Sequence, residues 1–222
     1  MRSRSCCASF WTANQRHFSD ATARRDLAHY RNGGLDATTR MLRDAILTAG
    51  NGRTVLDVGA GIGALSFELL AAGAERATVV EAAAAYVAAA REEATRRGLA
   101  HRLELVHGDF VTVVPDLEPA DVVTMDRVVC CYPAYRPLLE AAARRSLRLL
   151  AFSYPRDRWF VRAGVALQNV MRRIFRNPFR GFVHPARDME EVLTAHGFRR
   201  THRRETLKWS ADLYARGDAP YP

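Results

Sequence analysis

The stretch Val55-Leu-Asp-Val-Gly59-Ala-Gly61-Ile-Gly63-Ala-Leu65 decides the fold of this 222-residue chain. It begins within the short apolar run Arg53 to Val58, which is typical of a strand that is buried on both faces of a sheet. Three glycines follow at alternate positions, and a helical pattern starts at Ala64. A strand, a glycine turn and a helix in this order predict the first unit of an open parallel sheet, with a ligand crevice beside the turn.

Strand and helix patterns alternate on the C-terminal side of this stretch. Strand patterns occupy residues 53–58, 77–81, 103–107, 120–125 and 147–153. Helix patterns separate them at residues 64–72, 83–97 and 135–145. A short helix pattern and two further strand patterns follow at residues 188–196, 199–207 and 209–216. The sequence therefore predicts an α/β fold with an open, mostly parallel, doubly wound sheet, helices on both faces and a C-terminal antiparallel hairpin.

The length of the chain fits one domain. We expect an N-terminal tail at 1–20 and a single domain at 21–222, which begins with two helices within 21–48. An added, lid-like helical segment is expected at about 156–186, where an apolar stripe at helical spacing is flanked by arginines. Neither a transmembrane segment nor a signal peptide is expected, and the protein is expected to be cytoplasmic.

The net charge of +9 is concentrated in the C-terminal third, where residues 151–222 hold 14 Arg or Lys against 7 Asp or Glu. Such an excess raises the question of nucleic-acid binding. The sequence has no segment like the catalytic Asn-Pro-Pro-Tyr of nucleic-acid methyltransferases. We therefore expect a small-molecule partner and no nucleic acid, while peripheral contact of the added helix with a membrane surface stays open.

The four cysteines form two adjacent pairs, Cys6-Cys7 and Cys130-Cys131, which lack the spacing of a zinc site. No metal is expected. Cys130 and Cys131 are interpreted as packing residues near a cleft. Cys6 and Cys7 are expected in a frayed terminus, with a redox or metal role at the surface as the alternative.

Acidic residues lie at the same end of the predicted strands as the glycine turn. Glu81 ends the second strand, 22 residues after Gly59, which is the spacing of a carboxylate that accepts both hydroxyl groups of a ribose. Asp57 precedes the turn, and Asp109 follows the third strand. The three carboxylates in register with the glycines predict a site for an adenosine ligand.

The segments Asp57-Val-Gly-Ala-Gly-Ile-Gly63, Glu81 and Gly108-Asp109 resemble the motifs of class I S-adenosylmethionine-dependent methyltransferases, over about residues 35–155. The resemblance implies a Rossmann-like fold with S-adenosyl-L-methionine as cofactor. It also implies that the glycine turn contacts the methionine part, that Glu81 holds the ribose and that Asp109 contacts the adenine. The implied cofactor site comprises Asp57, Gly59, Ala60, Gly61, Gly63, Glu81, Ala82, Asp109, Phe110 and Asp126.

A narrower resemblance concerns Asp126-Arg-Val-Val-Cys-Cys-Tyr-Pro133, Ala151-Phe-Ser-Tyr-Pro155, the helix from Trp159 and Phe182-Val-His-Pro185. These segments are similar to those of magnesium-protoporphyrin IX methyltransferases, which esterify a porphyrin propionate. This chain has Cys131 where those enzymes usually carry a histidine. The similarity implies an O-methyltransferase that acts on a porphyrin-like or other planar, apolar carboxylate.

Candidates for contact with the acceptor lie after the fourth strand, in the added segment and in the N-terminal helix. The candidate catalytic residues are Tyr132, Tyr154 and His184, and the candidate substrate-binding residues are Tyr30, Arg156, Trp159 and Phe160. A carboxylate acceptor needs orientation and no base, whereas a phenol, an amine or a carbon acid needs its proton removed.

Two other functions share the predicted fold. One is an NAD(P)-dependent oxidoreductase, which would normally show a pair such as Tyr-x-x-x-Lys, but Lys208 is the only lysine and lies outside any such context. The other is a nucleic-acid methyltransferase that uses the arginine-rich C-terminal third.

Overall fold

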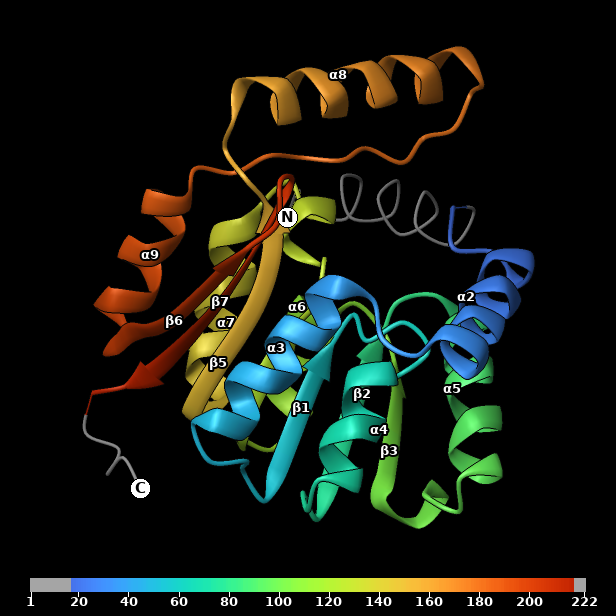
Figure 1. The fold of residues 1–222 in the computed structure, drawn as a ribbon, viewed down its shortest axis with the longest axis vertical. Coiled ribbons are helices and arrows are strands. Elements are labelled where there is room, and N and C mark those ends of the chain that lie inside the picture. The colour runs from blue at the N-terminus through green and yellow to red at the C-terminus, as the bar shows by residue number, and fades with distance from the viewer. Residues whose placement is uncertain (1–16, 218–222) are drawn as a thin grey trace.

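A computed structural model describes residues 17–217. Most of the expected tail at 1–20, with Cys6 and Cys7, lies outside the described residues. A seven-stranded sheet with the order β3-β2-β1-β4-β5-β7-β6 forms the centre (Figure 1). The strands are β1 (Thr54–Val58), β2 (Arg76–Glu81), β3 (Leu103–His107), β4 (Ala120–Met125), β5 (Ser146–Pro155), β6 (Phe198–Glu205) and β7 (Trp209–Arg216). Strands β1 to β5 are parallel, and β7 pairs antiparallel with both β5 and β6.

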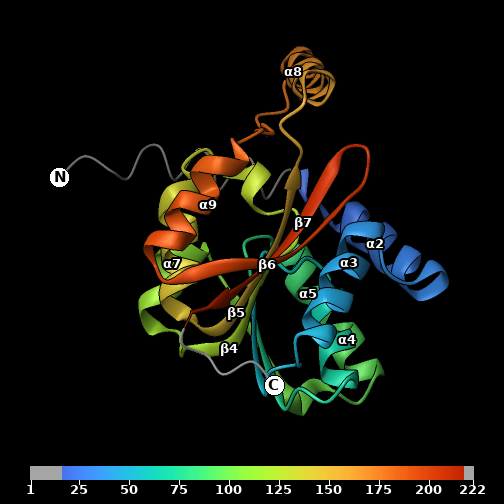
Figure 2. The same cartoon turned by 60° about the vertical axis from the view of Figure 1, so that its left-hand side comes forward.

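Helices cover both faces of the sheet (Figure 2). One face packs against α2 (Asp20–Gly33), α3 (Ala37–Thr48), α4 (Ala64–Ala71) and α5 (Ala84–Arg96). The other face packs against α6 (Phe110–Val113), α7 (Tyr135–Arg145) and α9 (Ala186–Ala195). Neighbouring residues of β1 serve opposite faces, because Val55 joins the first core and Leu56 joins the second. The central strands are apolar on both sides for this reason.

The predicted fold class is confirmed, and the observed elements differ from the predicted ones in the length of β5 and in several short helices. β5 extends to Pro155 because β7 pairs with it from Leu149 to the end. The helix α6 was not predicted, since its four residues are too few to show a period. Short 3-10 helices, also unpredicted, lie at Ala100–Arg102, Val114–Asp116 and Val129–Cys131.

A buried carboxylate joins the N-terminal helix α2 to α5. Glu93 is fully buried and accepts hydrogen bonds from Arg31 of α2 at 2.9 Å, from Arg96 at 2.6 Å and from Arg97 at 2.7 Å. These guanidinium groups, Arg96 first, lower the pKa of Glu93 to about 2. Glu93 is therefore ionised at neutral pH and fixes α2 beside the carboxyl edge of the sheet.

The added segment forms the helix α8 (Trp159–Ile174), which stands apart from the sheet in both views (Figures 1 and 2). Val161 is its one buried residue. After α8 the chain returns as an extended segment to α9. Between residues 17 and 217, no helix is both long enough and apolar enough to cross a membrane.

Candidate active site

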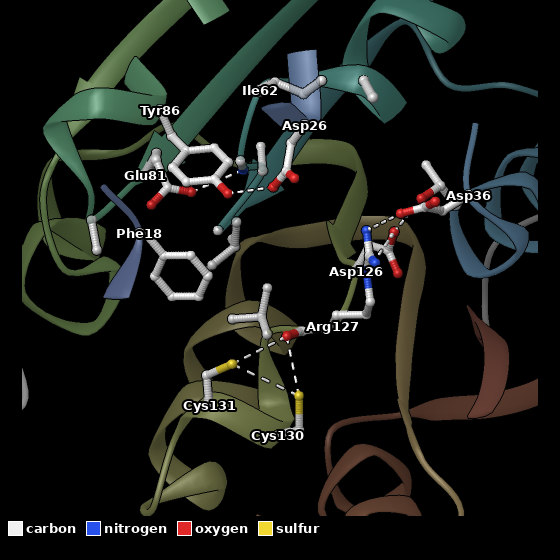
Figure 3. A pocket seen from close by; sticks show the side chains of 18 of the residues that line it. Phe18, Asp26, Asp36, Ile62, Glu81, Tyr86, Asp126, Arg127, Cys130 and Cys131 are labelled. Carbon is white, nitrogen blue, oxygen red and sulfur yellow. Dashed lines mark hydrogen bonds and ion pairs between the residues drawn. The ribbon is translucent and has the colours of Figure 1, made fainter. Parts of the chain in front are cut away.

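A cavity of about 600 Å³ lies at the carboxyl ends of β1, β2 and β4 (Figure 3). The strand order reverses between β1 and β4, and open parallel sheets bind ligands in the crevice at that point. The volume is that of a small-molecule site. Nine of the ten predicted cofactor residues line the cavity, namely Asp57, Gly59, Ala60, Gly61, Glu81, Ala82, Asp109, Phe110 and Asp126.

The glycine turn needs glycine at Gly59 for two reasons. Its φ of +60° lies in the left-handed region, and a Cβ would meet Val128 at 2.7 Å. The backbone can thus pass close to a ligand in the cavity. Gly63, the tenth predicted cofactor residue, does not line the cavity. It has a φ of +80° and is the N-cap of α4, so it positions the helix that follows the turn.

Glu81 ends β2 with its carboxylate held by two backbone amides. Its Oε2 accepts a hydrogen bond from the Gly61 amide at 2.9 Å, and its Oε1 accepts one from the Ala83 amide at 2.8 Å. The side chain is buried, and desolvation raises its pKa, while the two amides oppose that shift. Each carboxylate oxygen has further lone pairs. The carboxylate can therefore accept additional hydrogen bonds from a ligand without moving.

Asp57 lies in β1 directly below the turn. Its oxygens accept hydrogen bonds from Ser66 at 2.8 Å and from Thr124 at 2.7 Å. Burial is the largest influence and raises the pKa of Asp57 to about 6, against the effect of both hydroxyl groups. The side chain thus joins α4 and β4 to β1 at the floor of the cavity.

Asp109 and Tyr132 meet across the cavity, although they follow different strands. Asp109 caps α6, where it accepts a hydrogen bond from the Val111 amide at 3.3 Å. The Tyr132 hydroxyl donates a hydrogen bond to the same carboxylate. The predicted catalytic residue Tyr132 therefore lines the cavity beside a predicted cofactor residue.

Asp126 and Arg127 follow β4 at the cavity wall. Asp126 accepts hydrogen bonds from Thr39 of α3 and from Ser153 of β5, each at 2.5 Å. Arg127 has a φ of +60°, a strained conformation for a residue other than glycine, and contacts Asp36 at 2.8 Å. Sequence reasoning missed Arg127 and Asp36. The unusual φ and the partner in the α2–α3 connection emerge only in the folded chain.

The side of the cavity next to α2 contains three residues that the sequence analysis missed. The Tyr86 hydroxyl donates a hydrogen bond to Asp26 at 2.5 Å. Burial and Asp26 both raise the pKa of Tyr86, so it stays protonated. Phe18 packs against the Tyr86 ring at 5.7 Å between centroids. No motif marks these residues, since Tyr86 and Asp26 are 60 positions apart.

Tyr30, the predicted substrate-binding residue of α2, lines the cavity but is engaged elsewhere. Its hydroxyl donates a hydrogen bond to Glu68 of α4 at 2.9 Å, and the Arg97 guanidinium lies 4.7 Å from its ring centroid. The side chain is buried. Tyr30 therefore attaches α2 to α4, and its hydroxyl is not presented to an acceptor.

The predicted catalytic residues Tyr154 and His184 do not line the cavity. The buried Tyr154 hydroxyl donates to Asp212 of β7 at 2.9 Å and accepts from Arg203 of β6 at the same distance. Burial raises its pKa. His184 bonds through Nε2 to the carbonyl oxygen of Tyr132 at 2.9 Å. Both side chains hold the structure together.

The predicted substrate-binding residues Arg156, Trp159 and Phe160 also lie outside the cavity. Arg156 bonds to Glu205 at 2.5 Å and to the carbonyl oxygen of Thr206 at 2.9 Å, so it braces the hairpin. Trp159 is 81% exposed and contacts Phe160 edge to face at the start of α8. The parts of α8 and the following segment that do reach the cavity are Val165, Gln168, Arg172, Phe179, Gly181 and Phe182.

Cys130 and Cys131 both line the cavity. Their sulfur atoms are 3.8 Å apart, and each donates to the Arg127 carbonyl oxygen. Cys130 is buried, as interpreted from the sequence, whereas Cys131 is half-buried. The hydrogen bond with Cys131, together with burial, raises the pKa of the Cys130 thiol. Within residues 17–217 no cluster of side chains is suited to hold a metal ion.

Residues 55–151 match the family model of a methyltransferase domain. Magnesium protoporphyrin IX methyltransferase from Synechocystis PCC 6803 with bound SAH is a similar solved structure, at 19% identity over 92% of this chain and 99% of that one, with a TM-score of 0.72. The same enzyme with bound SAM gives 17% identity over 93% and 97%, with a TM-score of 0.70.

An O-methyltransferase family protein from Burkholderia thailandensis shares 18% identity over 91% of this chain and 64% of that one, with a TM-score of 0.64. No curated protein matches the chain. The chain thus has the fold of these methyltransferases, and the two Synechocystis structures with that fold contain bound SAH or SAM.

Proposed function

We propose that this protein is an S-adenosylmethionine-dependent methyltransferase that acts on a small-molecule acceptor, as an O-methyltransferase of a planar, apolar carboxylate. The observation that carries the proposal is the Glu81 carboxylate, which two backbone amides hold at the end of β2 in the wall of the cavity. A carboxylate in this place suits the two hydroxyl groups of a ribose.

The residues of the cavity fit the cofactor. Gly59 leaves room for a ligand to approach the backbone, Glu81 would hold the ribose, and Asp109 would contact the adenine beside Phe110. When bound, S-adenosylmethionine supplies a methyl group on a positively charged sulfur. The chain's task is to align the acceptor with that methyl group and to exclude water.

Three hydrogen-bonded contacts attach the N-terminal helices to the rim of the cavity. They are Tyr86 with Asp26, Arg127 with Asp36, and Thr39 with Asp126. We call them the rim contacts. Each joins α2, α3 or the connection between them to a residue beyond the glycine turn. This arrangement supports a role for α2 and α3 in covering the bound cofactor.

The part of the cavity next to α8 supports an apolar, anionic acceptor. Val165, Phe179 and Phe182 offer apolar surface there, and the Arg172 guanidinium lies 4.9 Å from the Phe179 ring centroid. Arg127 adds a second cation in the same lining. A carboxylate acceptor needs no base, and a cation with a flat apolar wall is sufficient to orient it.

The alternative functions fit the lining less well. Its carboxylates, Asp26, Asp36, Asp57, Glu81, Asp109 and Asp126, would repel the phosphates of a nucleic acid. A dinucleotide places its pyrophosphate on the amides of the glycine turn. Here the Gly61 amide already donates to Glu81. The lining thus favours a nucleoside without phosphate groups.

Calorimetry with S-adenosylmethionine, its demethylated product and NAD tests the proposal. We expect the first two ligands to bind and NAD to bind far more weakly. Substituting Glu81→Ala should weaken cofactor binding by about tenfold or more, since hydrogen bonds to a charged group contribute roughly 1.5 to 3 kcal/mol. The matched control is Glu118→Ala, which removes an exposed carboxylate outside the cavity. Tight binding of NAD, or unchanged binding by Glu81→Ala, would refute the assignment.

A further inference from the structure

The helix α8 carries a cluster of exposed apolar side chains. Nine large hydrophobic residues are exposed in the described part of the chain, and six of them lie between positions 159 and 175. Their exposed fractions are 81% for Trp159, 64% for Leu167, 54% for Val170, 44% for Met171, 65% for Ile174 and 74% for Phe175. We call these six residues the outer face. An exposed apolar cluster of this kind marks an interaction surface.

Most of the outer face points away from the body of the protein. At 100° per residue, Trp159, Leu167 and Ile174 fall on one side of the helix. The opposite side carries Val161, which is buried, and Val165, which lines the cavity. An ordinary surface helix turns its apolar side inward and its polar side to water. α8 does the reverse, so the outer face fits a partner outside the chain.

The charge around α8 indicates which kind of partner fits the outer face. Residues 158–180 contain six arginines and neither Asp nor Glu. Arg162 is paired with Asp157, and Arg172 lies over Phe179. Arg158, Arg173 and Arg176 are exposed at the ends of the helix. Within residues 17–217, none of these last three has an acidic partner within 4 Å.

A second copy of the chain on the outer face would bring two sets of arginines together, and like charges repel. An anionic surface would instead attract them, at about 1 kcal/mol for each arginine near the lipid headgroups. We propose that α8 docks this protein onto bilayers that contain anionic lipid. Trp159 and Phe175, at the two ends of the helix, and the side chains between them would enter the boundary between headgroups and acyl chains.

This docking would place the cavity beside the bilayer. Val165, Gln168 and Arg172 belong to the inner side of α8 and line the cavity. An acceptor dissolved in the lipid could therefore enter the cavity directly from the bilayer. Docking itself rests on the outer face and the arginines and not on methyl transfer, so it is tested without cofactor or acceptor.

Flotation of the full chain with lipid vesicles tests the proposal. We expect capture by phosphatidylcholine vesicles that contain about 30 mol% phosphatidylglycerol, and little capture by vesicles of phosphatidylcholine alone. Capture should weaken as salt is raised, because counterions screen the arginines. The fluorescence of Trp159 should shift to shorter wavelength on binding. Trp159→Phe should lose that shift and still float, because Phe keeps the apolar contact.

Two triple variants separate the apolar and the charged contributions. Leu167→Gln, Val170→Gln and Ile174→Gln together should reduce vesicle affinity about tenfold or more. Arg158→Gln, Arg173→Gln and Arg176→Gln together should reduce it about hundredfold. All six positions are exposed, so the fold should survive, as a thermal melt will show. The matched controls are Leu147→Gln with Leu207→Gln, and Arg24→Gln with Arg91→Gln and Arg204→Gln, all exposed positions outside α8.

Three outcomes would overturn the proposal. The first is the absence of capture by anionic vesicles at low salt. The second is capture that the control variants weaken as much as the α8 variants do. The third is a dimer of the intact chain in sedimentation that the outer-face triple variant dissociates, since a second copy would then cover the outer face. Each outcome leaves the calorimetric test of cofactor binding unaffected, so the two proposals can fail separately.

Discussion

Two carboxylates at the carboxyl edge of the sheet, Glu81 and Asp57, accept hydrogen bonds from different kinds of donor. Backbone amides hold Glu81, whereas hydroxyl groups hold Asp57. The difference matters for charge. The hydroxyl groups offset only part of the desolvation of Asp57, which leaves its pKa at about 6. Asp57 is therefore expected to change its protonation state within the pH range in which the protein can be studied.

Because the folded pKa of Asp57 lies above the ordinary value of 3.8, the native state binds its proton more tightly than the unfolded state does. Its contribution to the free energy of unfolding is complete below pH 4 and is lost as the pH rises through 6. Asp57→Asn has no charge to bury. Relative to the wild type, it should gain about 1 to 2 kcal/mol of stability between pH 5 and pH 7. Urea denaturation of both proteins at pH 5 and at pH 7 measures this gain. If the variant and the wild type differ in stability by the same amount at both pH values, the prediction is contradicted.

The two tyrosines that the sequence proposed as catalytic provide a paired test. Tyr132→Phe removes the hydrogen bond to Asp109, and we expect cofactor affinity to fall about tenfold with little loss of stability. Tyr154→Phe removes the buried hydrogen bond to Asp212, so it should destabilise the fold by about 1.5 to 3 kcal/mol and leave cofactor affinity unchanged. Calorimetry and urea denaturation on both variants give the answer. If Tyr154→Phe instead lost cofactor affinity and Tyr132→Phe lost stability, Tyr154 would belong to the site.

Tyr154 also shows where sequence reasoning about residues ends. The strand β5 is buried on both faces, so its pattern does not indicate which side chains reach a cavity. The partner of Tyr154 lies 58 positions away in β7. By contrast, Glu81 and Asp109 were predictable, because a residue at the end of a parallel strand lies at the ligand edge whatever its later partners are. Asp26, Asp36 and Arg127 had no such positional rule.

At the scale of elements, strands and long helices were predictable because their apolar periods are set by the layers they fill. α6 has no period, and the extension of β5 depends on its pairing with β7. The apolar stripe of α8 was visible in the sequence, but a stripe does not say whether it faces the core or the solvent. Trp159 and Phe160, which the sequence predicts to contact the acceptor, lie outside the lining of the cavity for this reason.

The attachment of α2 to α5 through Glu93 predicts an acid-sensitive contact. Its folded pKa of about 2 lies below the ordinary 4.5, so its stabilisation is complete above pH 4.5 and is lost as the pH falls toward 2. Glu93→Gln should lower the free energy of unfolding at pH 7 by about 2 kcal/mol, a value reduced for the partial exposure of the arginines. The difference in the free energy of unfolding between Glu93→Gln and the wild type should shrink as the pH falls from 5 to 3.

Glu92→Gln is the matched control for Glu93. Glu92 lies next to it in α5 and pairs with Arg31 at 2.8 Å, but its side chain is 63% exposed. An exposed ion pair contributes at most about 1 kcal/mol. Urea denaturation of the two variants at pH 7 should therefore separate them clearly. Equal effects would mean that burial of Glu93 does not strengthen the attachment.

At the scale of the whole molecule, the rim contacts link the N-terminal helices to the part of the sheet that would hold the cofactor. Asp26 lies in α2, Asp36 precedes α3, and Thr39 lies in its first turn. Their partners follow β2 or β4, on both sides of the cavity. A ligand in the cavity therefore lies between two parts of one connected structure, and its binding should stabilise both.

The demethylated cofactor, at a concentration about 100 times its dissociation constant, should stabilise the protein by about 2.7 kcal/mol. For a chain of this size that corresponds to a rise in melting temperature of about 5 to 10 °C. Hydrogen exchange should show the added protection in α2 and α3 as well as at the glycine turn, while α9 and β6, which lie away from the cavity, change little.

Removing two rim contacts with Asp26→Asn and Asp36→Asn should reduce the protection of α2 and α3 more than that of the turn. Protection confined to the turn in the wild type would show that the helices do not close on the ligand.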